Sequence, residues 1–156
     1  MAHILVIDDD ATYRGILREF IEKAGHTVTE AENADEGVQI FLREKIDLVI
    51  SDLMMPVKSG MDLLQELRGI NPKVLFILVT GFPTIDAATD SIKAGAYDFL
   101  VKPVQMNQLS IVMKRALSTL ELKSNLSTIR GVNIALFISV PLWILLGYMV
   151  KVFLVD

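Results

Sequence analysis

Five short apolar runs, separated by stretches with the periodicity of helices, constrain the fold of this chain more than any other feature. The runs cover residues 3–7, 27–31, 47–51, 74–79 and 97–101. Their length and apolar content predict five β-strands. Three of them are almost continuously hydrophobic, which is typical of strands that have helices on both faces.

Between these runs, apolar residues recur with the period of an α-helix. One such face comprises Tyr13, Ile16, Leu17, Phe20, Ile21 and Ala24, and Gly25 ends it. Similar faces lie in residues 34–43, 61–67 and 85–94, and a fifth helix is expected from about residue 105. The alternation predicts an α/β fold, with a doubly wound sheet of five parallel strands and helices on both sides.

Polar residues follow four of the five predicted strands. In chain order they are Asp8 and Asp9, Asp52, Thr80, and Lys102, which precedes Pro103. In such sheets, functional side chains gather beyond the carboxyl ends of the strands. Three carboxylates there would repel one another, and a hard divalent cation such as Mg²⁺ relieves that repulsion. With an ammonium and a hydroxyl opposite, the pocket would hold a phosphoryl group for in-line attack by Asp52.

Four sequence motifs resemble the receiver domain of two-component response regulators. They are VIDDD, SDLMMP, VTGFP and GAYDFLVKP, and they occur in the expected order over about residues 1–121. The resemblance implies a flavodoxin-like fold and phosphorylation of Asp52 by a histidine kinase or phosphotransfer protein. It also implies Mg²⁺ as the cofactor, bound directly by Asp9, mainly through water by Asp8, by Asp52, and by the backbone carbonyl of Met54.

The same resemblance assigns roles to the residues around the predicted phosphoryl group. Lys102 is expected to bind the phosphate, and Thr80 and Phe99 are expected to turn toward it as a switch. Pro103 is expected to follow a cis peptide bond, and Gly81 to leave the approach open for a donor. The face formed by the fourth helix, fifth strand and fifth helix is expected to form a homodimer or to dock a partner.

The chain is not expected to be an enzyme with an external substrate, although it would catalyse its own phosphorylation from a phosphodonor. Self-dephosphorylation is expected to be slow. The reason is that Met54 and Phe82, which border the path of attacking water in the family, are bulky and apolar.

Simpler interpretations exist for several of these residues. Asp9 or Asp10 would suit the N-cap of a helix, and an aromatic residue in a strand, such as Phe99, is often packing. Residues 8–12 also fit the DxDxT start of haloacid-dehalogenase-type phosphatases, with Asp8 as nucleophile and Asp10 as acid and base. That family needs a second acidic pair after its lysine, whereas residues 103–120 contain no Asp or Glu. It also leaves Asp52 without a role.

Composition bears on partners and location. The net charge of −4 gives no basic surface for nucleic acid, and no helix-turn-helix or other DNA-binding output is expected after the receiver. The chain has no cysteine and no N-terminal secretion signal, so a cytoplasmic location is the default expectation.

An uncharged apolar stretch, residues 131–150, lies near the C-terminal end of the sequence. A helix of this length spans roughly 30 Å, the thickness of the hydrocarbon core of a bilayer. We therefore expect four parts: a receiver in 1–121, a helical linker in 122–130, a transmembrane helix in 131–150 and a short tail in 151–156. Basic residues before the stretch outnumber Lys151 beyond it, which predicts a cytoplasmic receiver anchored to the inner membrane.

Two alternatives to a membrane anchor remain open from the sequence. In one, the chain is a soluble single-domain receiver or phospho-shuttle, and its apolar helix forms a dimer or partner interface. In the other, the chain is a fragment of a longer membrane protein.

Overall fold

The computed structural model of the protein describes residues 1–120. The predicted linker, membrane helix and tail, residues 122–130, 131–150 and 151–156, lie outside them. The chain divides into two units, Met1–Leu117 and Ser118–Asp156, and the fold below is that of the first. Within residues 1–120, no helix is both long and apolar enough to cross a membrane.

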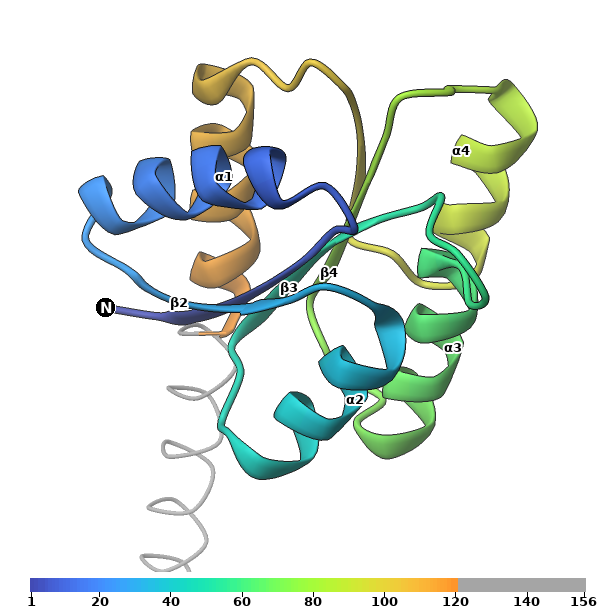
Figure 1. Ribbon diagram of the computed structural model, residues 1–156, viewed down its shortest axis with the longest axis horizontal. Coiled ribbons are helices and arrows are strands. Elements are labelled where there is room, and N and C mark those ends of the chain that lie inside the picture. The colour runs from blue at the N-terminus through green and yellow to red at the C-terminus, as the bar shows by residue number, and fades with distance from the viewer. Residues whose placement is uncertain (121–156) are drawn as a thin grey trace, which may run out of the picture. The chain divides into compact units, whose positions relative to one another are not determined.

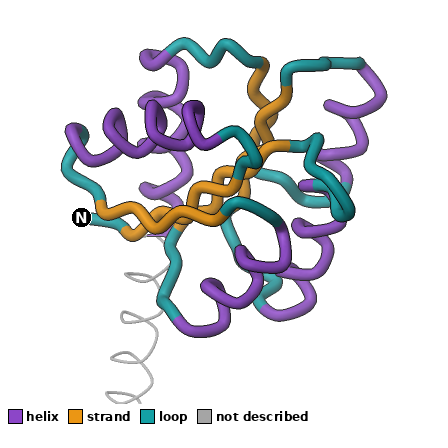
Figure 2. The backbone as a smooth tube through the Cα atoms, viewed as in Figure 1, coloured by secondary structure: helices purple, strands orange, loops and turns teal. Residues whose placement is uncertain are grey.

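Five parallel strands form a single sheet, as the sequence predicts. The strands are β1 (His3–Ile7), β2 (Thr27–Ala31), β3 (Leu48–Asp52), β4 (Phe76–Thr80) and β5 (Asp98–Val101). Their order across the sheet is β2-β1-β3-β4-β5, and every neighbouring pair is parallel. Figure 2 shows the strands together in the middle of the fold, with helices around them. β3 and β4 are buried along their whole length, which explains their continuous apolar sequences.

Two strands end one residue later than predicted, at the residues that matter most for the site. Asp52 belongs to β3 because it pairs with Val79, and the next amide, of Leu53, donates to the Val79 carbonyl. Thr80 belongs to β4 because it pairs with Val101. The backbone positions of both residues are therefore fixed by the sheet itself.

Helices alternate with the strands. They are α1 (Ala11–Lys23), α2 (Ala34–Arg43), α3 (Gly60–Ile70) and α4 (Ile85–Lys93), followed by a helix that begins at residue 106 and, within this unit, reaches residue 117. The N-caps of α1 to α4 are Asp10, Asn33, Ser59 and Thr84, whose side chains accept backbone N–H groups. Asp10, rather than Asp9, thus caps α1.

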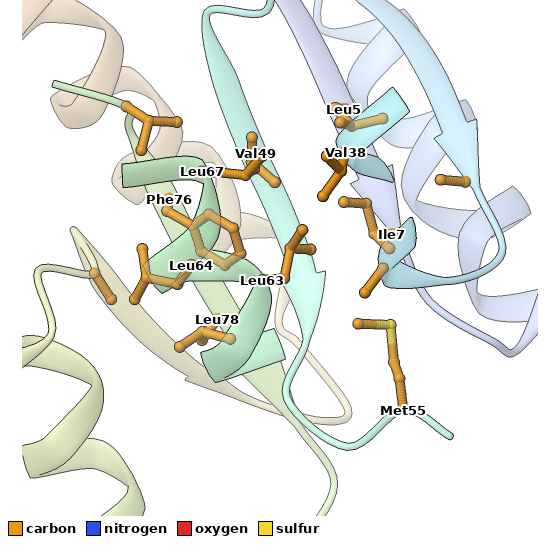
Figure 3. Packing of buried hydrophobic residues seen from close by; sticks show 14 of the residues in the cluster. Leu5, Ile7, Val38, Val49, Met55, Leu63, Leu64, Leu67, Phe76 and Leu78 are labelled. Carbon is orange, nitrogen blue, oxygen red and sulfur yellow. The ribbon is translucent and has the colours of Figure 1, made fainter. Parts of the chain in front are cut away.

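The helices form two layers around the sheet. In Figure 1, α1 and the helix from residue 106 lie on one face, and α2, α3 and α4 lie on the other. On the second face, Leu5, Val49, Phe76 and Leu78 of the strands pack against Val38, Leu63, Leu64 and Leu67 of α2 and α3 (Figure 3). Each fully buried large side chain contributes about 1.5–3 kcal/mol to stability, so the strand ends project from a rigid base.

Candidate functional site

The carboxyl ends of β1, β3 and β5 bring together three charged side chains that are far apart in the sequence. Asp8 follows β1, Asp52 ends β3 and Lys102 follows β5. The Lys102 ammonium donates to a carboxylate oxygen of Asp8 at 2.6 Å and to one of Asp52 at 2.7 Å. One lysine thus bridges two carboxylates, as the positions of these residues after predicted strands suggest.

Burial shapes the electrostatics of this bridge. Asp8 is 1% exposed and Asp52 is 7% exposed. Burial raises the pKa of Asp8, and the hydrogen bond from Lys102 only partly opposes this. For Lys102, burial alone would lower the pKa, but the hydrogen bonds to Asp52 and Asp8 outweigh it and the pKa is raised. The lysine is therefore firmly charged, whereas burial disfavours the charged form of Asp8.

A third carboxylate completes an acidic cluster. Asp8, Asp9 and Asp52 each offer a carboxylate oxygen, and these oxygens lie within 4.8 Å of one another. Asp9 is exposed, so the cluster opens to solvent on one side. Three carboxylates against the single ammonium of Lys102 leave two negative charges. This charge and an all-oxygen donor set fit a divalent cation such as Mg²⁺.

Met54 lies beside the same cluster. Its backbone amide donates to the second carboxylate oxygen of Asp52 at 3.1 Å, and its side chain is 59% exposed. The turn after β3 therefore brings the Met54 backbone amide next to the Asp52 carboxylate, and the role of the Met54 carbonyl as a ligand stays a prediction.

Thr80 occupies the end of β4. The residue is fully buried, and its hydroxyl accepts a hydrogen bond from the Phe82 amide at 3.2 Å. Its carbonyl accepts from the backbone amide of Lys102 at 2.8 Å, which links the ends of β4 and β5. A β-carbon added to Gly81 would meet nothing within 4 Å, and the Phe82 side chain is 78% exposed.

The remaining predicted residues lie on or just after β5. Phe99 is half-buried and packs against the hydrophobic cluster beneath α2, α3 and α4. This is the packing role that the sequence left open, and the predicted rotamer change of Phe99 stays a prediction. The peptide bond between Lys102 and Pro103 is cis.

Tyr13 is a residue of the site that the sequence pattern did not reveal. The pattern placed it only on the apolar face of a helix, yet the Lys102 ammonium lies 4.4 Å from the centroid of its ring. A cation–π contact of this kind has no sequence signature, because the lysine is 89 residues away along the chain.

Two further supporting residues were also missed. The Arg14 guanidinium donates to the backbone carbonyl of Asp8 at 2.5 Å and so holds the turn that carries the acidic residues. Gly60, the first residue of α3, leaves no space for a side chain, because a β-carbon there would lie 2.1 Å from the carbonyl oxygen of Asp52. A glycine directly after the Ser59 cap was the available signal for this close approach.

The haloacid-dehalogenase alternative assigns acid–base chemistry to Asp10, but that side chain is already engaged. One of its carboxylate oxygens accepts the backbone amides of Thr12 at 2.8 Å and Tyr13 at 3.2 Å. Asp52, which that alternative leaves without a role, lies in the centre of the cluster instead.

Among curated proteins, the transcriptional regulatory protein ZraR of Klebsiella oxytoca is 30% identical over 115 residues, which is 74% of this chain and 26% of ZraR. The transcriptional regulatory protein GlrR of Escherichia coli K12 is 37% identical over 108 residues, which is 69% of this chain and 24% of GlrR. The chain thus spans about a quarter of the length of the curated relatives it matches.

Solved structures are also similar to this chain. A response regulator receiver domain protein from Clostridium thermocellum is 39% identical, with a TM-score of 0.75 over 78% of this chain and 98% of that one. NtrX from Brucella abortus is 31% identical, with a TM-score of 0.76 over 81% of this chain and 29% of that one. The family model of the response regulator receiver domain matches residues 4–114. This chain therefore belongs to the receiver domain family of two-component response regulators.

Proposed function

We propose that the chain is a phosphorylation switch that accepts a phosphoryl group on Asp52 from a histidine kinase or phosphotransfer protein. The observation that carries this proposal is the Lys102 ammonium shared between Asp52 and Asp8 at 2.7 and 2.6 Å. This contact supports the proposal because it joins a carboxylate that would act as nucleophile to an ammonium that would bind phosphate, beside the acidic cluster. Asp8, Asp9, Asp52 and the Met54 carbonyl would hold Mg²⁺ there.

In the proposed reaction, a carboxylate oxygen of Asp52 forms a bond to phosphorus. The bond between phosphorus and the histidine nitrogen of the donor breaks, and the electron pair stays on that nitrogen. Lys102 moves its hydrogen bond from Asp52 to a phosphoryl oxygen, which keeps the ammonium paired throughout. When bound, Mg²⁺ supplies positive charge that offsets the negative charge of the phosphoryl oxygens.

The switch would begin at Thr80. Its hydroxyl oxygen already accepts from the Phe82 amide, so its O–H remains able to donate to a phosphoryl oxygen on Asp52. Movement of Thr80 would allow Phe99 to turn inward and would alter the surface formed by α4, β5 and the helix from residue 106. We propose that this surface forms a homodimer or docks a partner in the phosphorylated state.

The test is labelling of the full chain by acetyl phosphate in the presence of Mg²⁺, without any other enzyme. Wild type is expected to be labelled by its own catalysis, and Asp52→Asn is expected to be unlabelled. Labelling of Asp8→Asn is expected no longer to increase when Mg²⁺ is added. Retained labelling of Asp52→Asn together with loss in Asp8→Asn would instead support Asp8 as the nucleophile and overturn the proposal.

The lifetime of the aspartyl phosphate is a separate part of the proposal. Met54 and Phe82 are 59% and 78% exposed, and we propose that these two apolar side chains shield Asp52 from attacking water. We expect slow self-dephosphorylation, measured as loss of label after the donor is removed. Loss within seconds would contradict this expectation.

We also propose that the chain acts at a membrane rather than through a DNA-binding step of its own. The proposal is supported by the uncharged residues 131–150 and the basic residues before them, which would orient the receiver to the cytoplasm.

Membrane fractionation tests the anchor. The full chain is expected in the membrane fraction, and a chain that stops at residue 130 is expected in the soluble fraction. Equal solubility of the two would remove the anchor and favour a soluble receiver or phospho-shuttle. In that case the size of the full chain in solution would show whether residues 131–150 form a dimer interface.

A further inference from the structure

Tyr13 lies in the first turn of α1 and contacts Lys102, the lysine of the acidic cluster. The Lys102 ammonium is 4.4 Å from the centroid of the Tyr13 ring, well inside the distance at which a cation is attracted by an aromatic face. The ammonium has three N–H donors, and two groups, the carboxylates of Asp8 and Asp52, accept from it. The ring is therefore the third group beside the ammonium. It belongs to α1, whereas Asp8 follows β1 and Asp52 ends β3.

The Tyr13 hydroxyl is buried beside the loop that follows Lys102. Among the described residues, no group meets the distance and angle of a hydrogen bond to this hydroxyl. Burial raises the pKa of Tyr13, although the backbone of Val104 is near enough to oppose the shift. The phenol is therefore neutral, and the ring presents an uncharged face to the ammonium. Tyr13 thus contacts both Lys102 and the segment two residues beyond it.

Apolar packing alone does not require an aromatic ring at this position. A leucine would suit the apolar face of α1 equally well, and a phenylalanine would keep the ring without burying a hydroxyl. The feature that a leucine lacks is the aromatic face beneath the charge. Without that face, the ammonium would keep only the two carboxylates of these three contacts, and it would be freer to move toward solvent.

We propose that Tyr13 is a positioning residue for phosphoryl transfer, whose ring face holds the Lys102 ammonium in line with Asp52. This inference rests on the proposed function of Asp52 and adds a residue to it. Tyr13 does not contact the reacting atoms. It acts by keeping Lys102 where the oxygens of an incoming phosphoryl group would be, so the rate of transfer depends on the ring and not on the hydroxyl.

The experiment compares Tyr13→Phe and Tyr13→Leu in the full chain. Two quantities are measured: the rate of labelling by acetyl phosphate with saturating Mg²⁺, and the proton chemical shift of the Lys102 ε-methylene group by nuclear magnetic resonance. A ring beneath the lysine shifts that signal upfield. We expect Tyr13→Phe to keep the wild-type rate and the shift, and Tyr13→Leu to lose the shift and roughly tenfold in rate.

Phe20→Leu is the matched control. Phe20 is another aromatic residue on the same helix, about 10 Å further along its axis at 1.5 Å per residue. Its replacement is expected to leave both the labelling rate and the Lys102 signal unchanged. A Tyr13→Leu variant that fails to fold is replaced by Tyr13→Met, which also lacks the aromatic face.

The outcomes separate this inference from the function on which it rests. Labelling of Asp52→Asn would overturn the proposed function, whatever Tyr13 does. If Asp52 is the acceptor, a wild-type rate in Tyr13→Leu would overturn the positioning role alone. A Tyr13→Phe variant as slow as Tyr13→Leu would overturn it as well, because the hydroxyl and not the ring would then be required.

Discussion

Gly60 lies so close to Asp52 that a β-carbon on Gly60 would be 2.1 Å from the Asp52 carbonyl oxygen and 2.8 Å from a methyl carbon of Leu78. The Gly60 amide also donates to the carbonyl of Leu53 at 3.0 Å. The first turn of α3 therefore rests directly on the end of β3. This contact fixes the backbone that carries the proposed phosphoacceptor.

We expect Gly60→Ala to destabilise the fold and to disturb the site. The added methyl group meets backbone, which cannot rotate away, so α3 or the end of β3 has to shift. Overpacking of this kind costs about 1–3 kcal/mol. The free energy of unfolding, from urea denaturation followed by circular dichroism, measures the loss. Labelling of Asp52 should slow because its carboxylate moves relative to Lys102.

The same helix offers a matched control. Gly69 is exposed near the end of α3, and a β-carbon there would meet nothing within 4 Å. Gly69→Ala should stabilise the protein by about 0.5–1 kcal/mol, because alanine loses less conformational entropy than glycine in a helix. Equal stability of the Gly60 and Gly69 variants would refute the close approach of α3 to Asp52.

Asp8→Asn tests the cost of holding a buried carboxylate. Burial raises the pKa of Asp8, so the folded protein disfavours its charge even with Lys102 at 2.6 Å. Without Mg²⁺, we expect Asp8→Asn to unfold at a higher urea concentration than wild type. With Mg²⁺ at 100 times its dissociation constant, wild type should gain about 2.7 kcal/mol, and the variant should gain much less.

Asp10→Asn is the control for that substitution. Asp10 caps α1 outside the acidic cluster, and asparagine caps helices about as well as aspartate does. Its Mg²⁺-dependent gain in stability should match that of wild type. A loss of this gain in Asp10→Asn, with retention in Asp8→Asn, would place the cation elsewhere.

The pH dependence of stability follows from two raised pKa values. The folded state holds the Asp8 proton more tightly than the unfolded state, so the free energy of unfolding should fall as the pH rises from 3.8 through the raised pKa. The contribution of Lys102 should be complete below pH 10.5 and should be lost as the pH rises through its raised pKa. Urea midpoints measured against pH, for wild type and Asp8→Asn, test the acidic window. An identical pH dependence of the two proteins there would contradict this assignment.

Much of the fold could be predicted because its sequence patterns are local. The predicted ranges 3–7, 27–31 and 34–43 agree with β1, β2 and α2 at both ends. The predicted strands 47–51 and 74–79 end one residue before β3 and β4 do, because strand ends depend on pairing with a neighbouring strand. Asp52 joins β3 only through its pairing with Val79, which no local pattern encodes.

The site was predictable to the extent that its residues follow strands. Asp8, Asp52 and Lys102 each do so, and the parallel sheet brings them within hydrogen-bond distance. Gly60 and Tyr13 were missed because their roles depend on close approach between α3 or α1 and another element. Such contacts depend on packing, and an apolar pattern records only which face of a helix is covered.

Val57 lies between Met54 and α3, in the turn after the proposed phosphoacceptor, and its backbone is strained. Its φ is 69°, and the Lys58 amide donates to the Pro56 carbonyl at 2.7 Å across it. A β-branched residue rarely adopts this conformation, which costs about 1–3 kcal/mol. The side chain is fully exposed, so burial does not offset that cost.

We therefore expect Val57→Gly to stabilise the protein by about 1 kcal/mol, because relief of strain exceeds the entropy that glycine adds to the unfolded chain. Val57→Ala is the matched control: it removes the branched methyl groups but keeps the β-carbon, so it should gain less. Both values come from urea denaturation of the full chain without Mg²⁺. If Val57→Gly were less stable than Val57→Ala, entropy would dominate and the turn would not be strained. A more flexible turn should also slow labelling of Asp52, because the Met54 amide would hold the carboxylate less firmly at 3.1 Å.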